Sequence, residues 1–333
     1  MSDNMNVSFT NYTQFGIHNT GVRYTWVVYA IFIILSSLIG DFVILVASIK
    51  YNAFRLHKAI VAIMQHIAVC DIITSLNLTQ FLISLIAEKS ILGTSMCYAR
   101  SYITSFSFPA SFYLTAAMTT TKALMLKFPL QARLWTKMKA HLVCGGIWLF
   151  SLSTPLLMFI IDKDDVRFDY KQYACHYSAS SDPAWEFWLP IMGFFTSMLP
   201  ITIVIATTTW LIIKAKKVAK RGRSSLRWQG LSTVILTAVV YCLSVLPIAM
   251  YYISGDLVKD PKLNAYFYRS ATSIACLSVI SNFYIYSLTV NSFRELLVSW
   301  VTLLKKAVCG GELARESEKA ASTTRGRSSD TPV

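Results

Sequence analysis

Seven long apolar stretches with few charged residues recur along the chain, separated by short polar segments. They lie near residues 24–49, 59–87, 98–121, 138–161, 185–213, 229–253 and 265–290. A sparsely charged stretch of about 20 apolar residues is long enough to cross a bilayer. Because hydrocarbon offers the backbone no hydrogen-bond partner, such a stretch must be a helix. The pattern therefore predicts an all-α membrane protein, a seven-transmembrane helix bundle over residues 24–290.

Three further segments flank this bundle. Residues 1–23 form an N-terminal tail without the basic-then-apolar order of a signal peptide, so we expect the first helix to direct insertion. Residues 291–309 predict a short amphipathic eighth helix. Residues 310–333 are polar, which is typical of a disordered tail.

Composition and charge placement support a membrane location. The chain is 54% hydrophobic and 14% charged, whereas a soluble domain averages about 25% charged residues. The net charge is +14, and the basic residues gather in the connections after the first, third and fifth helices. The positive-inside rule places these connections in the cytoplasm and the N-terminus outside. Since the charges are divided among short loops of one membrane face, a nucleic-acid partner is disfavoured.

The N-terminal tail carries two Asn-x-Ser/Thr sequons, at Asn6 and Asn11. We expect both to be glycosylated, which agrees with an extracellular N-terminus. A third match, at Asn77, falls inside the second helix, where no glycan could attach.

Short motifs occur in a fixed order along the helices. They are Gly40-Asp41, Ile67-Ala68-Val69-Cys70-Asp71, Thr121-Lys122-Ala123, Trp148, Pro200, Ser244-Val245-Leu246-Pro247 and Asn282-Phe283-Tyr284-Ile285-Tyr286. Each alone is weak, but the order and spacing over residues 24–310 are specific. The chain resembles the rhodopsin-like (class A) G protein-coupled receptors, with divergent Asp-Arg-Tyr, Cys-Trp-x-Pro and Asn-Pro-x-x-Tyr motifs. Phe283 stands where the last motif has its Pro.

The resemblance implies a plasma-membrane receptor and not an enzyme. An extracellular ligand would displace the cytoplasmic end of helix six and open a cleft for a heterotrimeric G protein. At the inner end of helix three, Lys122 replaces the Arg that contacts the G protein, and Arg227 stands at the base of helix six. The coupling residues expected from the resemblance are Thr121, Lys122, Ala123, Arg227 and Tyr286. Two cations cannot form the usual ionic lock, so we expect high basal activity or atypical coupling.

Asp41 and Asp71 are carboxylates inside predicted membrane helices, where acids are costly and mark functional sites. In the resembled family, the acid at Asp71 binds sodium together with groups that correspond here to Ser111, Ser278 and Asn282. Asp41 replaces an amide and adds a second acid. Two close carboxylates cannot both ionise cheaply without a cation. We therefore expect a site for Na⁺ or for a shared proton, and no other metal or cofactor.

The resemblance also implies a ligand pocket in the outer half of the bundle. Its expected residues are Phe81, Ser101, Thr104, Ser105, Phe108, Met192, Thr196, Val245, Ala249, Tyr252, Tyr268 and Thr272. This set is neutral and rich in aromatic rings, with Arg100 and Arg269 expected only at the rim. A neutral, lipid-like or peptide ligand fits it. Thr104 stands where amine receptors have an Asp, which disfavours amines, and residues 265–290 hold no Lys that could bind retinal.

Cys97 and Cys175 both lie in predicted extracellular positions, and the resemblance implies a disulfide between them. Cys309 follows Lys305 and Lys306 and is a candidate for palmitoylation. The tail after it holds a Ser/Thr cluster that could be phosphorylated for arrestin binding, and its last residues resemble a PDZ ligand.

Two alternatives remain open at this stage. A decoy, scavenger or co-receptor of the same fold is favoured by Thr121-Lys122-Ala123 and by Val245. A transporter or channel could use Asp41 and Asp71 as a proton path. The sequence shows no metal-ligand constellation, and we expect His66 and His141 to be isolated, with His66 satisfied inside the bundle.

Overall fold

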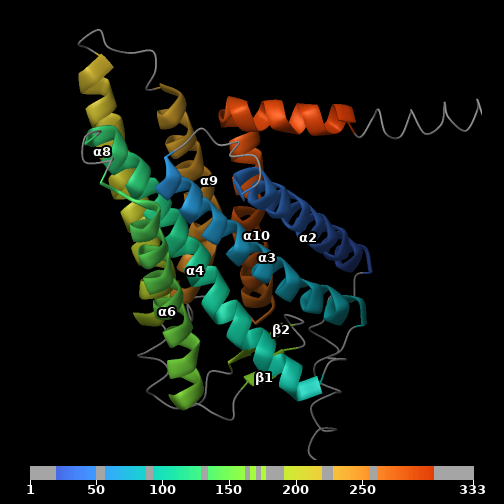
Figure 1. The fold of residues 1–333 in the computed structure, drawn as a ribbon. Coiled ribbons are helices and arrows are strands. Elements are labelled where there is room, and N and C mark those ends of the chain that lie inside the picture. The colour runs from blue at the N-terminus through green and yellow to red at the C-terminus, as the bar shows by residue number, and fades with distance from the viewer. Residues whose placement is uncertain are drawn as a thin grey trace, which may run out of the picture.

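The computed structural model describes residues 20–49, 57–87, 93–128, 134–161, 166–169, 174–177, 191–219, 228–254 and 261–303. Its helices and strands are α2 (Thr20–Ile49), α3 (Lys58–Ala87), α4 (Gly93–Lys127), α6 (Lys137–Ile161), β1 (Val166–Asp169), β2 (Ala174–Tyr177), η2 (Phe194–Met198), α8 (Leu199–Ala219), α9 (Trp228–Ser254) and α10 (Pro261–Thr289). Residues 291–303 form one more helix, which lies across the end of α10 (Figure 1). The predicted bundle and its eighth helix are confirmed.

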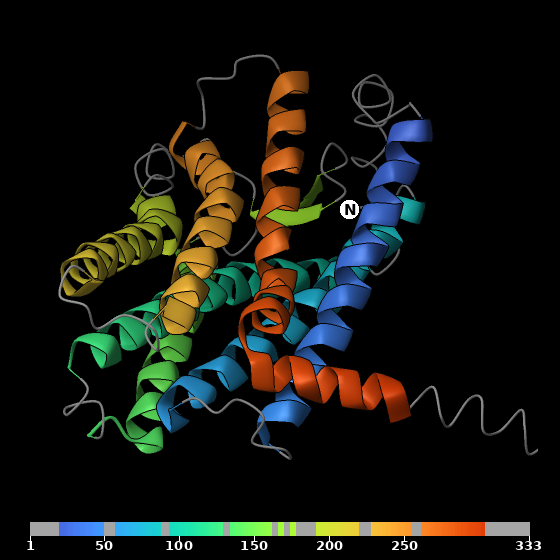
Figure 2. The same ribbon diagram turned by 90° about the horizontal axis from the view of Figure 1, so that it is seen from above.

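Six described helices are long and apolar enough to cross a bilayer. The seventh long helix, α4, falls below that hydropathy because it is rich in Ser and Thr. It contacts α3, α6, α8 and α9, and it passes through the middle of the bundle (Figure 2). The hydroxyl of Thr119 on α4 donates to the carbonyls of Thr115 and Ala116 one turn earlier in the helix, so burial leaves it hydrogen-bonded.

The outer surface of the helices carries large apolar side chains. Val28, Leu149, Leu243 and Leu288 are each between 66% and 72% exposed. An apolar surface of this extent is covered in a membrane protein by lipid. The chain is a multi-pass membrane protein.

Two local features differ from the sequence-based expectation. The third helix was expected over residues 98–121 but runs from Gly93 to Lys127, because Thr94 and Ser95 at one end and Lys122 and Lys127 at the other lower the apolarity of its ends without ending the helix. The connection before the fifth helix contains an antiparallel hairpin of β1 and β2, with Phe168 opposite Cys175. The sequence pattern did not predict this hairpin.

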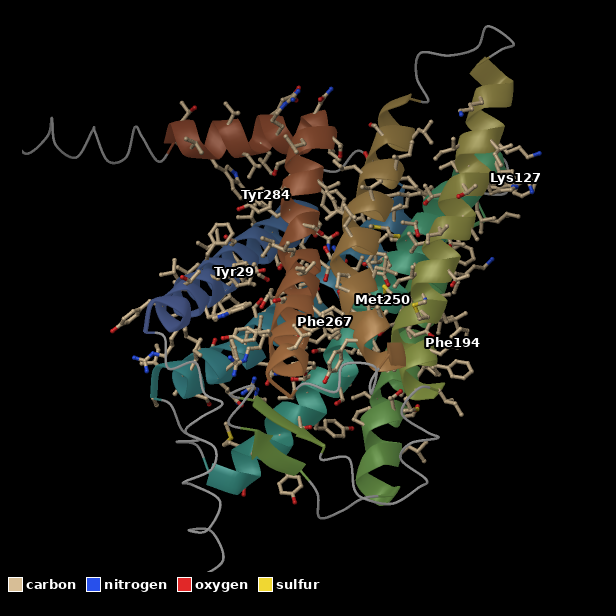
Figure 3. All side chains as sticks on the ribbon, turned by 180° about the vertical axis from the view of Figure 1, so that it is seen from behind. Tyr29, Lys127, Phe194, Met250, Phe267 and Tyr284 are labelled. Carbon is tan, nitrogen blue, oxygen red and sulfur yellow. The ribbon has the colours of Figure 1, made fainter. Side chains whose placement is uncertain are left out.

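The fifth helix contains one π-helical turn, η2, just before Pro200. Tyr113 of α4 donates its hydroxyl hydrogen to the carbonyl oxygen of Phe195 in this turn, at 2.5 Å. The side chain of Phe194, in the same turn, points away from the bundle (Figure 3) and is 48% exposed. α4 therefore satisfies a carbonyl group of the irregular turn.

Candidate functional site

Asp71 joins three helices in the interior of the bundle. Its Oδ1 accepts a hydrogen bond from the hydroxyl of Ser111 on α4 at 2.9 Å. Its Oδ2 accepts one from the amide Nδ2 of Asn282 on α10 at 3.1 Å. All three side chains are buried, with Asp71 at 0% exposed. The structure thus brings Asp71, Ser111 and Asn282 into direct contact.

Asp41 of α2 lies close enough to Asp71 for the two carboxyl groups to interact electrostatically. The hydroxyl of Ser37 donates to Oδ2 of Asp41 at 2.7 Å, while Oδ1 is buried and has no hydrogen-bond partner among the described residues. Ser278, the fifth expected member, donates to the carbonyl of Ala275 in its own helix. The hydroxyl oxygen of Ser278 can therefore still accept a hydrogen bond or bind a cation.

The residues present fit a hard cation such as Na⁺. The available donors are carboxylate, hydroxyl and amide oxygens, which are the ligands that such ions prefer. Oδ1 of Asp41 is a buried acceptor that a cation would satisfy. No group of three His, Cys, Asp or Glu comes together in the described part of the chain, as a transition-metal site would require.

Lys122, at the inner end of α4, is 7% exposed and lies over an aromatic ring. Its Nζ is 5.4 Å from the ring centroid of Tyr286 on α10, and no described group hydrogen-bonds to it. The hydroxyl of Tyr286 donates to the sulfur of Met118 at 2.9 Å. In place of an ion pair, a cation–π contact links α4 and α10 at this end.

The neighbours of Lys122 are packed and not exposed. Thr121 is 6% exposed, and Ala123 is 2% exposed in a cluster with Leu211, Leu231 and Val234 of α8 and α9. The inner end of α4 is therefore held to these helices by apolar contacts. Arg227 lies outside the described residues, so its expected position opposite Lys122 remains a prediction.

The expected ligand-pocket residues lie on α3, α4, the fifth helix, α9 and α10. Val245 and Ala249 are each 0% exposed and form one cluster with Phe112, against which Phe108 and Tyr268 pack. Thr104 accepts a hydrogen bond from Nδ2 of Asn77 on α3 at 2.7 Å, and Asn77 was not among the expected residues.

The remaining expected pocket residues make fewer described contacts with other helices. Ser101 is 2% exposed, Thr196 donates to the carbonyl of Met192 in its own helix, and Thr272 has a buried hydroxyl without a described partner. Ser105 and Met192 are partly buried. The side chain of Tyr252 lies outside the described part.

Arg100 and Arg269 are more deeply placed than expected. They are 8% and 9% exposed, and the Arg100 guanidinium lies 5.4 Å from the ring centroid of Phe81. Arg100 also interacts electrostatically with Tyr268 of α10. These charges belong to the interior of the bundle and are not confined to an exposed rim.

Cys97, at the start of α4, is disulfide-bonded. The strand β2, which carries Cys175, contacts α4. This placement agrees with the expected bridge, while the pairing itself stays a prediction. The sequons at Asn6 and Asn11, the candidate palmitoylation site Cys309 and the tail from residue 310 lie outside the described residues.

His66 and His141 were expected to be isolated, and this expectation was wrong. Nε2 of His66 on α3 lies 2.9 Å from Nδ1 of His141 on α6. The indole Nε1 of Trp148 donates to Nδ1 of His66 at 3.3 Å. The available sequence signal was only that each histidine follows the start of its helix by a short distance, eight residues for His66 and four for His141. Which helix faces meet could not be determined from that signal.

Comparisons with known proteins agree with this architecture. The family model described as 7 transmembrane receptor (rhodopsin family) matches residues 40–288. The chain is 23% identical over 259 residues to the mouse protein "Cysteinyl leukotriene receptor 1", covering 74% of this chain and 70% of that protein. The human protein of the same name is 22% identical, covering 60% and 58%. "Cephalotocin receptor 1" of Octopus vulgaris is 26% identical, covering 58% and 47%.

Proposed function

Because the chain belongs to the rhodopsin family of seven-transmembrane receptors, we propose that it is a plasma-membrane receptor that transduces an extracellular ligand to heterotrimeric G proteins. The observation that carries this proposal is the contact of Asp71 with Ser111 and Asn282. It couples α3, α4 and α10 in the interior, so a ligand that favours another arrangement of these helices shifts the whole bundle. Such a shift is limited by the ligand's difference in affinity for the two arrangements.

The proposed orientation has an extracellular N-terminus and a cytoplasmic eighth helix. It is supported by the basic connections, and by the described Lys127, which lies at the same end of the molecule as the helix of residues 291–303 (Figure 3). The coupling surface would include Thr121, Lys122, Ala123 and Tyr286. Arrestin and a PDZ protein are proposed partners of the C-terminal tail.

The ligand is proposed to be lipid-like or a peptide with a largely neutral body. The outer half of the bundle combines hydroxyl groups and aromatic rings, and Arg100 and Arg269 add positive charge to it. Two relatives are named for a cysteinyl leukotriene and for cephalotocin. These two ligands are the first ones to test.

The second candidate function is that of a non-signalling decoy or scavenger. Lys122 favours it, because its Nζ is buried against Tyr286 and has none of the planar, forked donors of an Arg. A basal-coupling panel separates the two functions. The full chain is expressed with each class of G protein and with arrestin, without ligand. Signal above that of mock-transfected cells supports the receptor, and its absence across the panel supports the decoy.

A further inference from the structure

Trp148 determines the protonation pattern of the relay formed by Trp148, His66 and His141. An indole N–H can only donate a hydrogen bond, so Nδ1 of His66 must accept it and carries no proton. Neutral His66 therefore has its proton on Nε2, which donates across 2.9 Å to Nδ1 of His141. The proton of His141 is then on its Nε2. The relay is complete in one arrangement, with both imidazoles neutral.

An additional proton cannot enter this relay without breaking a hydrogen bond. On Nδ1 of His66 it would face the donor of Trp148. On Nδ1 of His141 it would place two N–H groups against each other at 2.9 Å. Nε2 of each histidine already carries a proton, so an additional proton must go to an Nδ1 that accepts a hydrogen bond. One of the two hydrogen bonds is then lost. The relay thus distinguishes neutral from charged histidine through its geometry.

Other ionisable groups of the neighbouring helices are directed elsewhere. Among the described residues, His141 is the group whose charge acts on His66. On α4, Lys122 faces Tyr286 and Lys127 faces Phe128 and Trp210. Asp41 of α2 is bonded to Ser37, Asp71 of α3 is bonded to Ser111 and Asn282, and Lys139 of α6 donates to the carbonyl of Leu134. The thiols of Cys70 and Cys144 are buried. Lys58, at the start of α3, and Lys137, four residues before His141 on α6, have exposed side chains.

The relay lies near one end of the bundle. His66 follows the start of α3 by eight residues and His141 follows the start of α6 by four, which corresponds to about 12 Å and about 6 Å along the helix axes. Both side chains are partly exposed and lie within about three helical turns of that end. In the proposed orientation this is the cytoplasmic end, and that assignment depends on the proposed function.

We propose that the Trp148–His66–His141 relay is a proton-sensitive switch between α3 and α6. When the cytoplasm acidifies, one imidazole takes up a proton, a hydrogen bond of the relay breaks, and the packing of α6 against α3 loosens. The ligand of this site is the proton. The relay with both histidines neutral keeps both hydrogen bonds and is more stable than the relay with one histidine charged.

The test measures thermal unfolding of the purified full-length chain in detergent, which exposes both ends of the bundle and needs no ligand or G protein. The midpoint temperature of unfolding is compared at about pH 7.5 and about pH 5.5, on either side of the ordinary imidazole pKa of about 6.5. A matched pair of proteins, wild type and the double variant His66→Asn/His141→Asn, is measured under both conditions. On acidification we expect the wild type to lose about 2–4 °C more than the double variant, as the loss of about one hydrogen bond implies.

His57→Asn is the control histidine variant. Nδ1 of His57 accepts the backbone N–H of Ala59 at the start of α3, a bond that the oxygen of Asn keeps in acid. This variant therefore measures the acid loss that comes from the helix start, and it should keep the larger loss that comes from the relay. Equal acid losses in the wild type and the double variant overturn the proposal. Failure of all G protein coupling would leave this result intact, so the switch and the receptor function are tested separately.

A measurement on the wild type covers the case in which the double variant does not fold. Nitrogen-15 NMR of the labelled histidines should show His66 protonated at Nε2 and unprotonated at Nδ1 at about pH 7.5, with one imidazole gaining a proton by about pH 5.5. A proton on Nδ1 of His66 at the higher pH would overturn the relay as described.

Discussion

Gly40 of α2 and Phe283 of α10 meet so closely that no side chain fits between them. A methyl group added to Gly40 would lie 2.8 Å from Cβ and 2.9 Å from Cγ of Phe283. The ring of Phe283 also packs edge-on against Phe293 of the eighth helix, at 6.1 Å between centroids. The residue that replaces the family's Pro thus connects the first, seventh and eighth helices.

Gly40→Ala should therefore destabilise the bundle by about 1–3 kcal/mol through overpacking. Thermal unfolding of the purified protein measures this loss. Gly145→Ala on α6 is the matched control, since a Cβ at Gly145 meets nothing within 4 Å. It should leave stability unchanged or raise it. In a double-mutant cycle with Phe283→Gly, which removes both the Cβ and the Cγ that the added methyl meets, Gly40→Ala should cost less than it does in the wild type, and an equal cost in both backgrounds would contradict this contact.

We expect Na⁺ to stabilise the protein through Asp71 and Asp41. Replacing KCl by NaCl at constant ionic strength should raise the unfolding temperature of the wild type, since binding to the folded state adds RT ln(1 + [Na⁺]/Kd). Asp71→Asn removes the carboxylate held by Ser111 and Asn282 and should abolish the effect. Asp41→Asn restores the family's amide and should change the sodium and pH profile. An unchanged profile in that variant would exclude a role for Asp41.

Removing the amide of Asn282 should also be costly in the absence of added salt. Asn282→Ala leaves Oδ2 of Asp71 without its described donor in a fully buried position. The loss of stability should be about 1–3 kcal/mol. Ser281→Ala at the preceding position is the control and should cost less than half as much, since the described hydrogen bond of the Ser281 hydroxyl goes to the carbonyl of Ser278 in the same helix.

The cation–π contact of Lys122 with Tyr286 should hold the resting state less firmly than an ion pair. The double substitution Thr121→Asp/Lys122→Arg supplies an adjacent acid and a forked cation. If this double substitution stabilises the resting state by about 1 kcal/mol, basal signalling should fall about fivefold. Basal G protein activation per receptor at the cell surface measures this. Lys122→Arg alone serves as control, and basal signalling that stays the same in the double variant counts against the interpretation.

Tyr113→Phe should destabilise the π-helical turn by about 0.5–1.5 kcal/mol, because the carbonyl of Phe195 loses its side-chain donor. Tyr102→Phe on the same helix is the control, since the described contact of Tyr102 is that of its ring with Phe106. If both variants unfold at the same temperature, the hydroxyl of Tyr113 contributes nothing to this turn.

The length and apolarity of the spans predicted the bundle, because hydrocarbon allows few other backbone structures. The contact of Asp71 with Ser111 and Asn282 was also expected, since the resemblance fixes these positions at known spacings. The relay of His66 and His141 was not, because it depends on the rotation of α3 and α6 about their axes. The β1–β2 hairpin was missed because its strands have only four residues each, so the alternation of Val166 to Asp169 is too short to distinguish from chance, and Ala174 to Tyr177 do not alternate.

Phe283 has a mechanical consequence beyond its packing. α10 has a proline only at its first residue, Pro261, so its backbone hydrogen-bond ladder is not interrupted by a proline ring down to Thr289. A helix of this kind has no proline kink at Phe283, the position at which the family's motif carries its Pro. We therefore expect an inward movement of Tyr286 to be a tilt of the whole of α10, and the eighth helix to move with it because Phe293 packs on Phe283.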